Sequence, residues 1–441
     1  MSLRARQQSM HPLMKSIFSH LLFFTIPLIL LGEAATLYRA KKIQVTPSLL
    51  YQPGEILIEN GIIKAVGDSV KSPEGCRIVE WKNSEIYPGL ISPGSSLGLA
   101  EINALRPTKD LSEVGTHTPG IEAWVAVNPD SELIPVARAN GITHSLTVPM
   151  GGIISGTSGL IKLHGWGTED ITIKKNVALH LWWPSHGLSI PSPSHENKSK
   201  SIKEQEKERK KRISEIDEFF DQAIAYKTLK RSGDKNFLQI PSWEAMIPVI
   251  EGKTPLMIHA NESSQIKAAV QWAEKRNFKF TLSDARDAWK HADWLASKKI
   301  PVIFRHIFSA PLHRSSPHDE HFKAPGILGR AGVPLSIGLP LGGWSTANQR
   351  NLPYHAAHGV PYGLSREKAL AAITIEPAKV CGIDHRLGTL KKGKEASFIR
   401  TSGDILDIRV SVLGMVIQGN EVSLESRHTR LNSRYLNRPK P

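Results

Sequence analysis

Cysteine is nearly absent from this chain, which has only Cys76 and Cys381 among its 441 residues. Two thiols exclude a framework of several disulfides and any zinc site built from cysteines. A single bridge between them is one alternative, and two isolated buried thiols are the other. No G-x-G-x-x-G motif opens any of the predicted helices, which argues against a dinucleotide-binding fold.

Long hydrophobic runs are absent beyond the N-terminus. The one such run, IFSHLLFFTIPLILL, follows Arg4, Arg6 and Lys15 and precedes the small-residue segment GEAA. This order of basic, apolar and small residues is typical of a secretory signal peptide, and the run is short for a bilayer span of about 20 residues. We therefore expect a signal peptide over residues 1–35 and a periplasmic or secreted protein without a membrane span. An uncleaved N-terminal anchor is the alternative.

Positive charge is in excess, with a formal net charge of +15, and part of it lies in NKSKSIKEQEKERKKR. Because this run has both signs and no interleaved aromatic residues, it predicts a solvated helical insertion at about 195–232, and we expect no nucleic-acid partner. Ile213, Ile216 and Phe220 recur at helical spacing, so the second half of the insertion should pack on the rest of the chain. Adhesion of residues 200–212 to an acidic cell surface is a weaker alternative.

Short alternating strands are predicted at both ends of the chain. Near the N-terminus, Asn60 and Gly61 separate two such segments, which is a strong signal for a two-residue hairpin turn. Near the C-terminus, Gly419 and Asn420 in SVLGMVIQGNEVSL are expected to close another hairpin. These patterns predict one small β domain built from residues 36–86 and 386–425.

The long middle of the chain alternates strand and helix patterns, most clearly in TPLMIHANESSQIKAAVQWAEKRNFKFTLSDARDAWKHADWLASKKIPVIF. Serial βα units imply parallel strands with helical crossovers. The pattern alone leaves a closed (β/α)8 barrel and an open doubly wound sheet as alternatives.

Several phrases together resemble the amidohydrolase superfamily, particularly its imidazolonepropionase-like secreted members. They are IENGIIKAVG with YPGLI, then IHANESSQIKAAVQWAE, and then RNLPYHAAHGVPYGLSREKALAAITIEPAKVCGIDHRLGTLKKGKEASFI. The likeness covers nearly all of the chain after the signal peptide, in the same order. It implies an α/β fold with a (β/α)8 TIM barrel over 87–385 and a composite β-sandwich formed from the N- and C-terminal segments.

The same resemblance implies a metal centre that this chain only partly retains. In the superfamily a divalent metal, commonly zinc, activates a water molecule for attack on an amide carbon. The resemblance places the usual histidine pair at Gly94 and Ser96 and the usual eighth-strand aspartate at Gly338, none of which is a good ligand. His259 is retained, and Asp284 stands where a histidine is usual. A catalytic zinc needs three protein ligands, so we expect a degenerate site with one divalent metal such as zinc, bound in part by His259, or with none.

His259 and Asp284 are therefore the predicted catalytic pair, because a carboxylate beside an imidazole fixes its tautomer and raises its basicity. A hydrogen-bonded core histidine is the alternative for His259. Loops at the carboxyl ends of barrel strands supply further candidates. The predicted substrate-binding residues are Glu101, Arg106, Arg350 and Asn351. Salt bridges within the loop are the alternative for Glu101 and Arg106.

We assign no catalytic role to the histidines outside this pair. His306, His313, His318 and His321 are predicted to lie in an exposed loop that could order over the pocket, since two prolines interrupt the segment. His355 and His358 share a helix face and are predicted to lie behind the barrel.

The sequence thus predicts an amidohydrolase-like hydrolase acting on a non-peptide carbon–nitrogen bond, in an amide or cyclic amide, with a small polar, amide-like molecule as its ligand. The rival prediction is a catalytically inactive exported barrel that binds a small polar ligand or a protein partner. A homodimer is the oligomeric state that the resemblance favours.

Overall fold

The computed structural model describes residues 35–188, 200–311 and 315–439. The predicted signal peptide, apart from Ala35, and His313 lie outside these ranges. Within them, no helix is both long and apolar enough to cross a bilayer.

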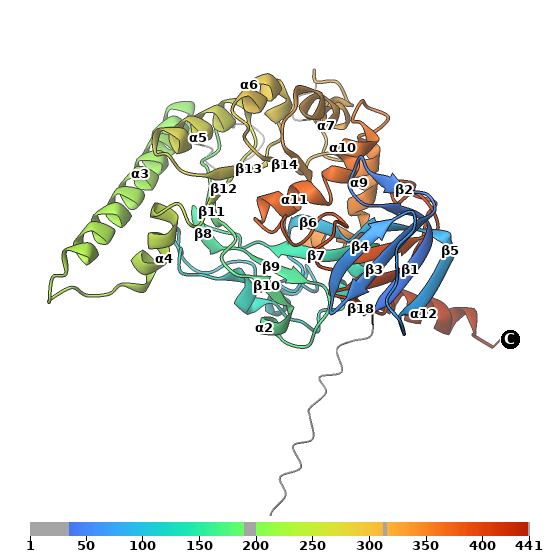
Figure 1. The fold of residues 1–441 in the computed structure, drawn as a ribbon. Helices are drawn as coiled ribbons and strands as arrows, with labels where there is room; N and C mark the ends of the chain where they lie inside the picture. The colour runs from blue at the N-terminus through green and yellow to red at the C-terminus, as the bar shows by residue number, and fades with distance from the viewer. Residues whose placement is uncertain (1–34, 189–199, 312–314, 440–441) are drawn as a thin grey trace, which may run out of the picture. The chain divides into compact units, whose positions relative to one another are not determined.

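One eight-stranded sheet joins the two ends of the chain (Figure 1). Its order is β18-β17-β16-β5-β1-β3-β4, with β2 paired to β1, so β5 lies between an N-terminal and a C-terminal strand. The pairing of the two ends supports a composite β domain, but the second layer of the predicted sandwich is not confirmed. The strands are β1 (Thr36–Gln44), β2 (Leu50–Tyr51), β3 (Gly54–Glu59), β4 (Ile62–Gly67), β5 (Arg77–Pro88), β16 (Phe398–Thr401), β17 (Val412–Ile417) and β18 (Asn420–Glu421).

Two turns of this sheet show how the hairpin patterns translate into backbone geometry. Asn60 and Gly61 both have positive φ, 51° and 71°, as the predicted turn between β3 and β4 requires. The C-terminal turn uses Gln418 and Gly419, with φ of 54° and 83°, and is one residue earlier than predicted. Asn420 already begins β18, because the glycine takes the second turn position, as it does in the N-terminal hairpin.

The middle of the chain forms two further sheets. One has the order β10-β9-β7-β6 and the other the order β15-β14-β13-β12-β11-β8. The strands from β11 to β15 are parallel neighbours, as the βα pattern predicted. The bounds are β6 (Leu90–Ser95), β7 (Ile142–Thr147), β8 (Ile154–Thr157), β9 (Gly159–Lys162), β10 (Thr172–Lys174), β11 (Leu179–Trp182), β12 (Leu256–Ala260), β13 (Phe280–Asp284), β14 (Val302–Phe304) and β15 (Leu335–Ile337).

These sheets differ from a closed, all-parallel ring at two places. β8 and β9 are separated only by Ser158 and pair antiparallel with β11 and β7 respectively, so this segment links the two sheets. Between β6 and β15, the backbone N–H groups of Ile91 and Ile337 donate to the carbonyls of Ile373 and Ala372. These loop carbonyls accept the bonds that a β6–β15 ladder would use. The prediction of a mixed α/β fold is confirmed. The arrangement is consistent with a TIM barrel, but the strand ladders of the described residues do not close into one ring.

Helices follow most of the parallel strands. The α-helices are α1 (Leu133–Arg138), α2 (Thr168–Ile171), α3 (Ile202–Ser232), α4 (Pro241–Ile250), α5 (Ser263–Lys275), α6 (Ala292–Ser297), α7 (Glu320–Ala331), α8 (Gly343–Thr346), α9 (Leu352–His358), α10 (Arg366–Ala371), α11 (Ile375–Val380) and α12 (Arg427–Leu436). Short 3-10 helices are η1 (Arg106–Thr108), η2 (Ala123–Ala126), η3 (Ala288–His291) and η4 (Gln349–Asn351).

Helix α3 is the predicted charged insertion. Ser201 and Glu204 form a reciprocal capping box at its start, and Gly233 ends it in the left-handed conformation. Ile216 and Phe220 are buried, whereas most of the lysine-rich first half is exposed. The helix therefore packs through its second half, as its apolar spacing predicted.

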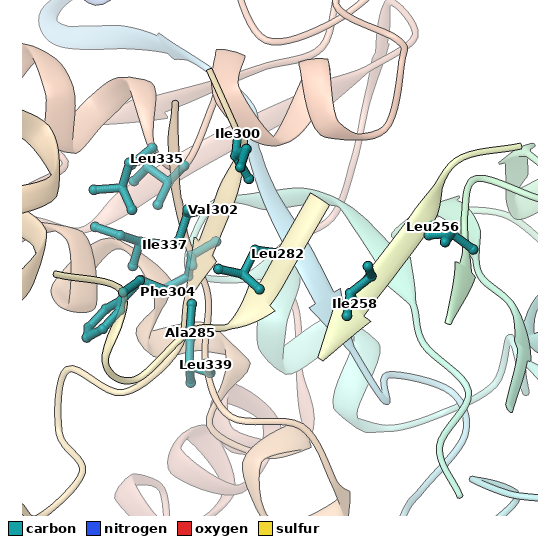
Figure 2. Packing of buried hydrophobic residues seen from close by; sticks show 14 of the residues in the cluster. Leu256, Ile258, Leu282, Ala285, Ile300, Val302, Phe304, Leu335, Ile337 and Leu339 are labelled. Atoms are coloured by element: carbon teal, nitrogen blue, oxygen red, sulfur yellow. The ribbon is translucent and has the colours of Figure 1, made fainter. Parts of the chain in front are cut away.

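The strand side chains alternate between two apolar environments. Leu256, Ile258 and Leu282 belong to the cluster that also contains Val270 of α5 and Leu328 of α7 (Figure 2). The intervening residue Met257 packs instead with Ile91 of β6, Leu146 of β7 and Ile303 of β14. Because side chains alternate along a strand, His259 lies on the same inner face as Met257.

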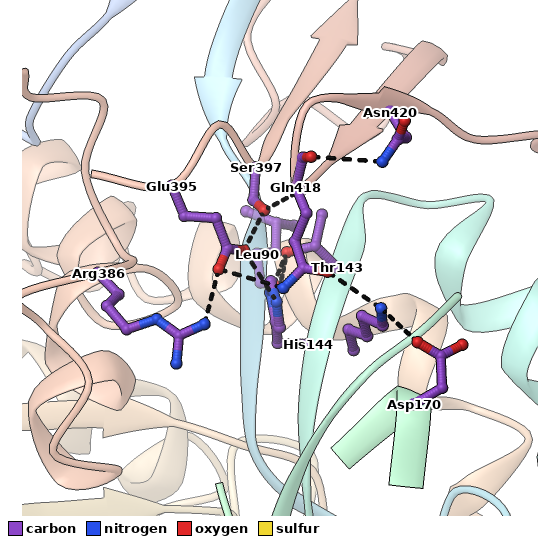
Figure 3. A network of polar contacts seen from close by, with 10 residues as sticks. Leu90, Thr143, His144, Asp170, Arg386, Glu395, Ser397, Gln418 and Asn420 are labelled. Atoms are coloured by element: carbon purple, nitrogen blue, oxygen red, sulfur yellow. Dashed lines mark hydrogen bonds and ion pairs between the residues drawn. The ribbon is translucent and has the colours of Figure 1, made fainter. Parts of the chain in front are cut away.

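A polar network connects β7 to the composite sheet (Figure 3). His144 Nε2 lies 3.8 Å from Glu395 Oε1, and Glu395 accepts hydrogen bonds from Arg386 Nη2 at 3.0 Å and Ser397 Oγ at 2.8 Å. Burial lowers the pKa of His144 to about 4, so this histidine is neutral near pH 7. The network stabilises the junction between the two groups of strands.

Candidate functional site

A chain of buried polar side chains links the inner faces of three neighbouring strands. His180 Nδ1 lies 2.8 Å from His259 Nε2, and His259 Nδ1 lies 2.7 Å from Asp284 Oδ2. These residues come from β11, β12 and β13, whose registers place His259 beside Trp182 and Ser283. The predicted pairing of His259 with Asp284 is present in the structure.

Ionisation fixes the direction of these hydrogen bonds. Burial would raise the pKa of Asp284, but the neighbouring His259 and Arg305 lower it to about 2, so the group is a carboxylate. Burial lowers the pKa of His259 and that of His180, and both are neutral near pH 7. A carboxylate only accepts, so His259 donates from Nδ1 to Asp284 and accepts at Nε2 from His180. The remaining nitrogen, Nε2 of His180, is buried and has no hydrogen-bond partner among the described residues.

Arg305 follows β14 directly and is fully buried beside this chain of polar groups. Its Nη1 donates to the carbonyls of Gly94 at 3.0 Å and Leu339 at 2.9 Å, and its Nη2 donates to the Pro93 carbonyl at 3.2 Å. Its Nε donates to Ser283 Oγ at 3.2 Å and lies 3.8 Å from Asp284 Oδ1. Burial lowers the pKa of Arg305 to about 10, so the guanidinium remains charged near pH 7.

The guanidinium of Arg305 fills the space that side chains at positions 94 and 338 would occupy. A Cβ atom on Gly94 would lie 2.4 Å from Nη2 of Arg305, and one on Gly338 would lie 2.7 Å from Nη1. These are the two positions where the resemblance expects a metal ligand of the first strand and one of the eighth strand. Neither could carry a larger side chain while Arg305 keeps this place.

The described residues do not fit the zinc centre that the resemblance implies. They contain no group of three or more His, Cys, Asp or Glu side chains arranged to hold a metal ion. Ser96 is buried with an unpartnered Oγ, but a serine hydroxyl is a poor zinc ligand. A permanent cation, Arg305, lies among the positions from which ligands would come.

Asp284 lies in a strained backbone segment, and a stacked tryptophan ring packs against His259. Asp284 and Ala285 have φ of 67° and 54°, which costs on the order of 1 kcal/mol or more for each residue without special compensation. Trp182 stacks on His259 with ring centroids 3.8 Å apart and an interplanar angle of 9°. His180, His259 and Asp284 are 0%, 3% and 8% exposed, so the pair is almost closed to solvent.

The four predicted substrate-binding residues lie elsewhere. Arg106 is exposed in η1, Glu101 is half-buried, and Arg350 donates from Nη1 to His428 Nδ1 at 2.8 Å. Asn351 lies at the start of α9. Within the described ranges, no hydrogen bond or ion pair joins any of them to His259 or Asp284. Their role in binding stays a prediction.

The prediction of an exposed histidine loop is wrong for two of its members. His306 is buried and contacts Ser309 Oγ through Nδ1 at 3.0 Å, and burial lowers its pKa to about 4. His321 belongs to α7 and is also buried, with Nδ1 2.8 Å from the Ser309 carbonyl. His306 directly follows the buried Arg305 after β14, and His321 is among the buried residues of α7, whereas His318 remains exposed.

Two residues of the site, His180 and Arg305, were missed in the sequence. His180 could have been found from the alternation in ALHLWW, where Leu179 and Leu181 are outer-face residues and His180 lies between them. Arg305 could have been found as the first polar residue after a buried strand, opposite two glycines on other strands.

Comparison with known proteins identifies the class of this fold. Residues 348–423 match the family described as the Amidohydrolase family. The chain is 22% identical over 413 residues to amidohydrolase tasK of Hapsidospora irregularis, an alignment that covers 86% of this chain and 41% of that protein. The chain thus spans about two fifths of the length of this curated relative.

Solved structures that are similar in fold also include amidohydrolases. An amidohydrolase from Thermotoga maritima MSB8 superposes with a TM-score of 0.75 at 23% identity, covering 88% of this chain and 99% of that one. A molinate hydrolase superposes with a TM-score of 0.54 at 15% identity, covering 89% and 95% of the two chains. The resemblance to the amidohydrolase superfamily is confirmed in sequence and in fold.

Proposed function

We propose that this chain is a non-catalytic member of the amidohydrolase family, in which the guanidinium of Arg305 replaces the metal ion. The observation that carries this proposal is the position of Nη1 and Nη2 of Arg305 against Gly338 and Gly94. The arginine supplies positive charge next to Asp284, as a metal would. It thereby compensates the buried carboxylate.

A guanidinium does not replace the chemistry of a metal. A zinc ion lowers the pKa of a bound water to about 7, whereas a guanidinium has no free coordination position. Four hydrogen bonds of Arg305 already go to protein acceptors, so few donors are left for a substrate. The side chains that would accept a proton from water, His259 and Asp284, are bonded to each other and buried.

The function that follows is binding. We propose that the chain retains the fold to bind a small polar, amide-like ligand or a protein partner. Hydrolysis of a non-peptide carbon–nitrogen bond is the second candidate, since neighbours in structure include a molinate hydrolase and phenylurea hydrolase B. The observation that favours hydrolysis is the unpartnered Nε2 of His180, which ends the series of hydrogen bonds from Asp284 through His259 to His180.

Metal content and turnover distinguish the two candidates. Purified protein should be incubated with zinc, dialysed and analysed for bound metal, and assayed against a panel of amides, cyclic amides and ureas. We expect no stoichiometric zinc at the site and no turnover above background. His385→Ala serves as a control, because His385 is exposed and any zinc that it loses is surface-bound. Stoichiometric zinc, or turnover that His259→Ala abolishes, would overturn the proposal in favour of the hydrolase.

Export and assembly are further parts of the proposal. We propose that residues 1–35 direct the chain to the periplasm or the medium, that no nucleic acid is bound, and that the chain is a homodimer. Cell fractionation with and without residues 1–35 tests the first point. Light scattering during size-exclusion chromatography tests the last one, and a mass near 48.7 kDa would contradict it.

A further inference from the structure

Helix α12 (Arg427–Leu436) is an exposed helix that lies outside the candidate site. None of its residues is buried, and Figure 1 shows it extending away from the strands that precede it. A helix of this length is marginal in water without further contacts. A reciprocal capping box between Ser426 and Thr429 closes its first turn, so the helix is formed although it has no buried face.

Polar contacts hold α12 to the rest of the chain. Arg430 donates from Nη2 to both carboxylate oxygens of Glu132, at 2.8 and 3.0 Å. Nδ1 of His428 lies 2.8 Å from Nη1 of Arg350. The pair of Arg430 and Glu132 is about half exposed, so it adds little to stability. The helix is therefore attached through polar groups and leaves its apolar side chains uncovered.

The apolar side chains of α12 face solvent. Tyr435 is 64% exposed and Leu436 is 76% exposed, and Leu431 is only half-buried. Leu431 and Tyr435 are four residues apart, so they are neighbours on one face of the helix. An ordinary surface helix turns its apolar stripe toward the core, and α12 does the reverse. This arrangement is typical of helices that lie in the interface of a lipid bilayer.

The positive charge of α12 is mostly uncompensated. After Glu425 the sequence contains four arginines and a lysine but no acidic residue. Within the part of the chain that the structure describes, the side chains of Arg427, Arg434 and Arg438 make no hydrogen bond or ion pair. Arg427 and Arg434 are seven residues apart, which places them on the same face of the helix. This face therefore selects an anionic partner.

The basic run of α3 is less suited to an anionic surface. Its lysines are interspersed with Glu204, Glu206 and Glu208, and Lys200 forms an ion pair with Glu208. Its charge is thus partly compensated within the helix itself. Because α12 has no acidic residue, adhesion to an acidic surface, considered above for residues 200–212, is better assigned to α12.

We propose that α12 binds the surface of an anionic phospholipid bilayer. Tyr435 and Leu436 enter the region between headgroups and acyl chains, and Arg427 and Arg434 lie at the lipid phosphates. The exposed tyrosine and leucine favour lipid over nucleic acid or an acidic protein, because a purely ionic partner would leave them in water. Peripheral binding of this kind needs no membrane-spanning helix. The proposal does not depend on whether the chain binds or hydrolyses a small ligand.

Sedimentation with vesicles tests the proposal. The described residues from Ala35 onward form one compact unit, so the chain can be tested without the preceding apolar run, which would itself bind lipid. Vesicles of phosphatidylcholine alone are compared with vesicles that also contain about 30% phosphatidylglycerol. We expect the anionic vesicles to be bound at least about tenfold more tightly. Equal binding of the two kinds of vesicle would overturn the proposal.

A pair of charge-matched variants locates the binding surface. Arg427→Gln combined with Arg434→Gln should weaken binding to the anionic vesicles about tenfold or more, since each basic residue near such a surface contributes about a fivefold factor. Lys203→Gln combined with Lys210→Gln removes the same charge from exposed positions of α3 and should change binding less than about twofold. Equal losses in the two variants would assign binding to the net charge of the chain and overturn the role of α12.

A third variant separates lipid from other anionic partners. Tyr435→Ser combined with Leu436→Ser keeps every charge and should weaken vesicle binding about tenfold, because two apolar side chains no longer enter the bilayer. Thermal unfolding of all three variants should give the wild-type Tm, since the changed side chains are exposed. Wild-type vesicle binding by this variant would show that the helix meets its partner through charge alone, and the lipid proposal would be wrong.

Discussion

Replacement of Arg305 by methionine should destabilise the protein in a way that depends on pH. The substitution keeps an unbranched, apolar side chain of similar length but removes the charge next to Asp284. Asp284 would then be a buried carboxylate without a cation, and removing one partner of a buried pair typically costs about 3–5 kcal/mol. Asp284 can limit this cost by taking up a proton.

The cost of protonating Asp284 is the upper limit on the free energy that its uncompensated charge can cost the variant. Neutralising an aspartate whose ordinary pKa is 3.8 costs about 4 kcal/mol at pH 7 and about 2 kcal/mol at pH 5. The three carbonyls that lose Arg305 add a further cost of about 1 kcal/mol each that does not change with pH. The variant should therefore recover about 3 kcal/mol relative to the wild type as pH falls from 7 to 5, since each pH unit changes the cost of protonation by about 1.4 kcal/mol.

Urea unfolding of matched variants at pH 5, 6 and 7 measures this difference. Arg305→Lys keeps the charge but not the planar donor group, so it should be destabilised without the pH trend. The trend should also vanish in Arg305→Met combined with Asp284→Asn, since no carboxylate is left. A gap between Arg305→Met and wild type that stays constant from pH 7 to 5 would refute the role assigned to the guanidinium.

Two further predictions concern buried histidines and a glycine. His144, His306 and His355 have folded-state pKa values of about 4, below their ordinary value of 6.5, so the stability that they contribute is present above pH 6.5 and is lost as pH falls toward 4. The urea midpoint should fall steeply between pH 6.5 and 4.5, and an unchanged slope in His355→Phe would contradict this cause. Gly94→Ala places a Cβ atom against Arg305 and should cost about 3 kcal/mol in urea unfolding, whereas Gly167→Ala, which meets nothing within 4 Å, should cost less than about 1 kcal/mol. Equal costs for the two would contradict the steric argument.

Local patterns predicted the parts of the fold that depend on local physics. The Asn60-Gly61 turn and the buried face of α3 follow from backbone preference and helical spacing, and both are present. Whether the strand ladders close into one ring was not predictable from local patterns, because closure depends on which distant backbone groups meet. No local pattern indicates that the carbonyls of Ala372 and Ile373 accept bonds from β15 and β6.

The candidate site was predictable only in part for a similar reason. His259 and Asp284 end neighbouring strands, so strand order was enough to place them together. Arg305 was not predictable in its role, because its guanidinium meets carbonyls of Pro93, Gly94 and Leu339, which lie far from it in the chain or beyond the next strand. A side chain of this length can reach several strands, and the sequence does not say which one.

The buried guanidinium also makes it hard to build a metal centre at this position by single substitutions. A histidine at position 94 or an aspartate at position 338 would collide with Arg305, so neither can come first. Loss of Arg305 alone would leave the buried Asp284 carboxylate without a cation before any metal ligand is present. Under the proposed function, each of these single steps toward a metal centre passes through a less stable protein, so lineages that carry this arginine should rarely acquire the ion.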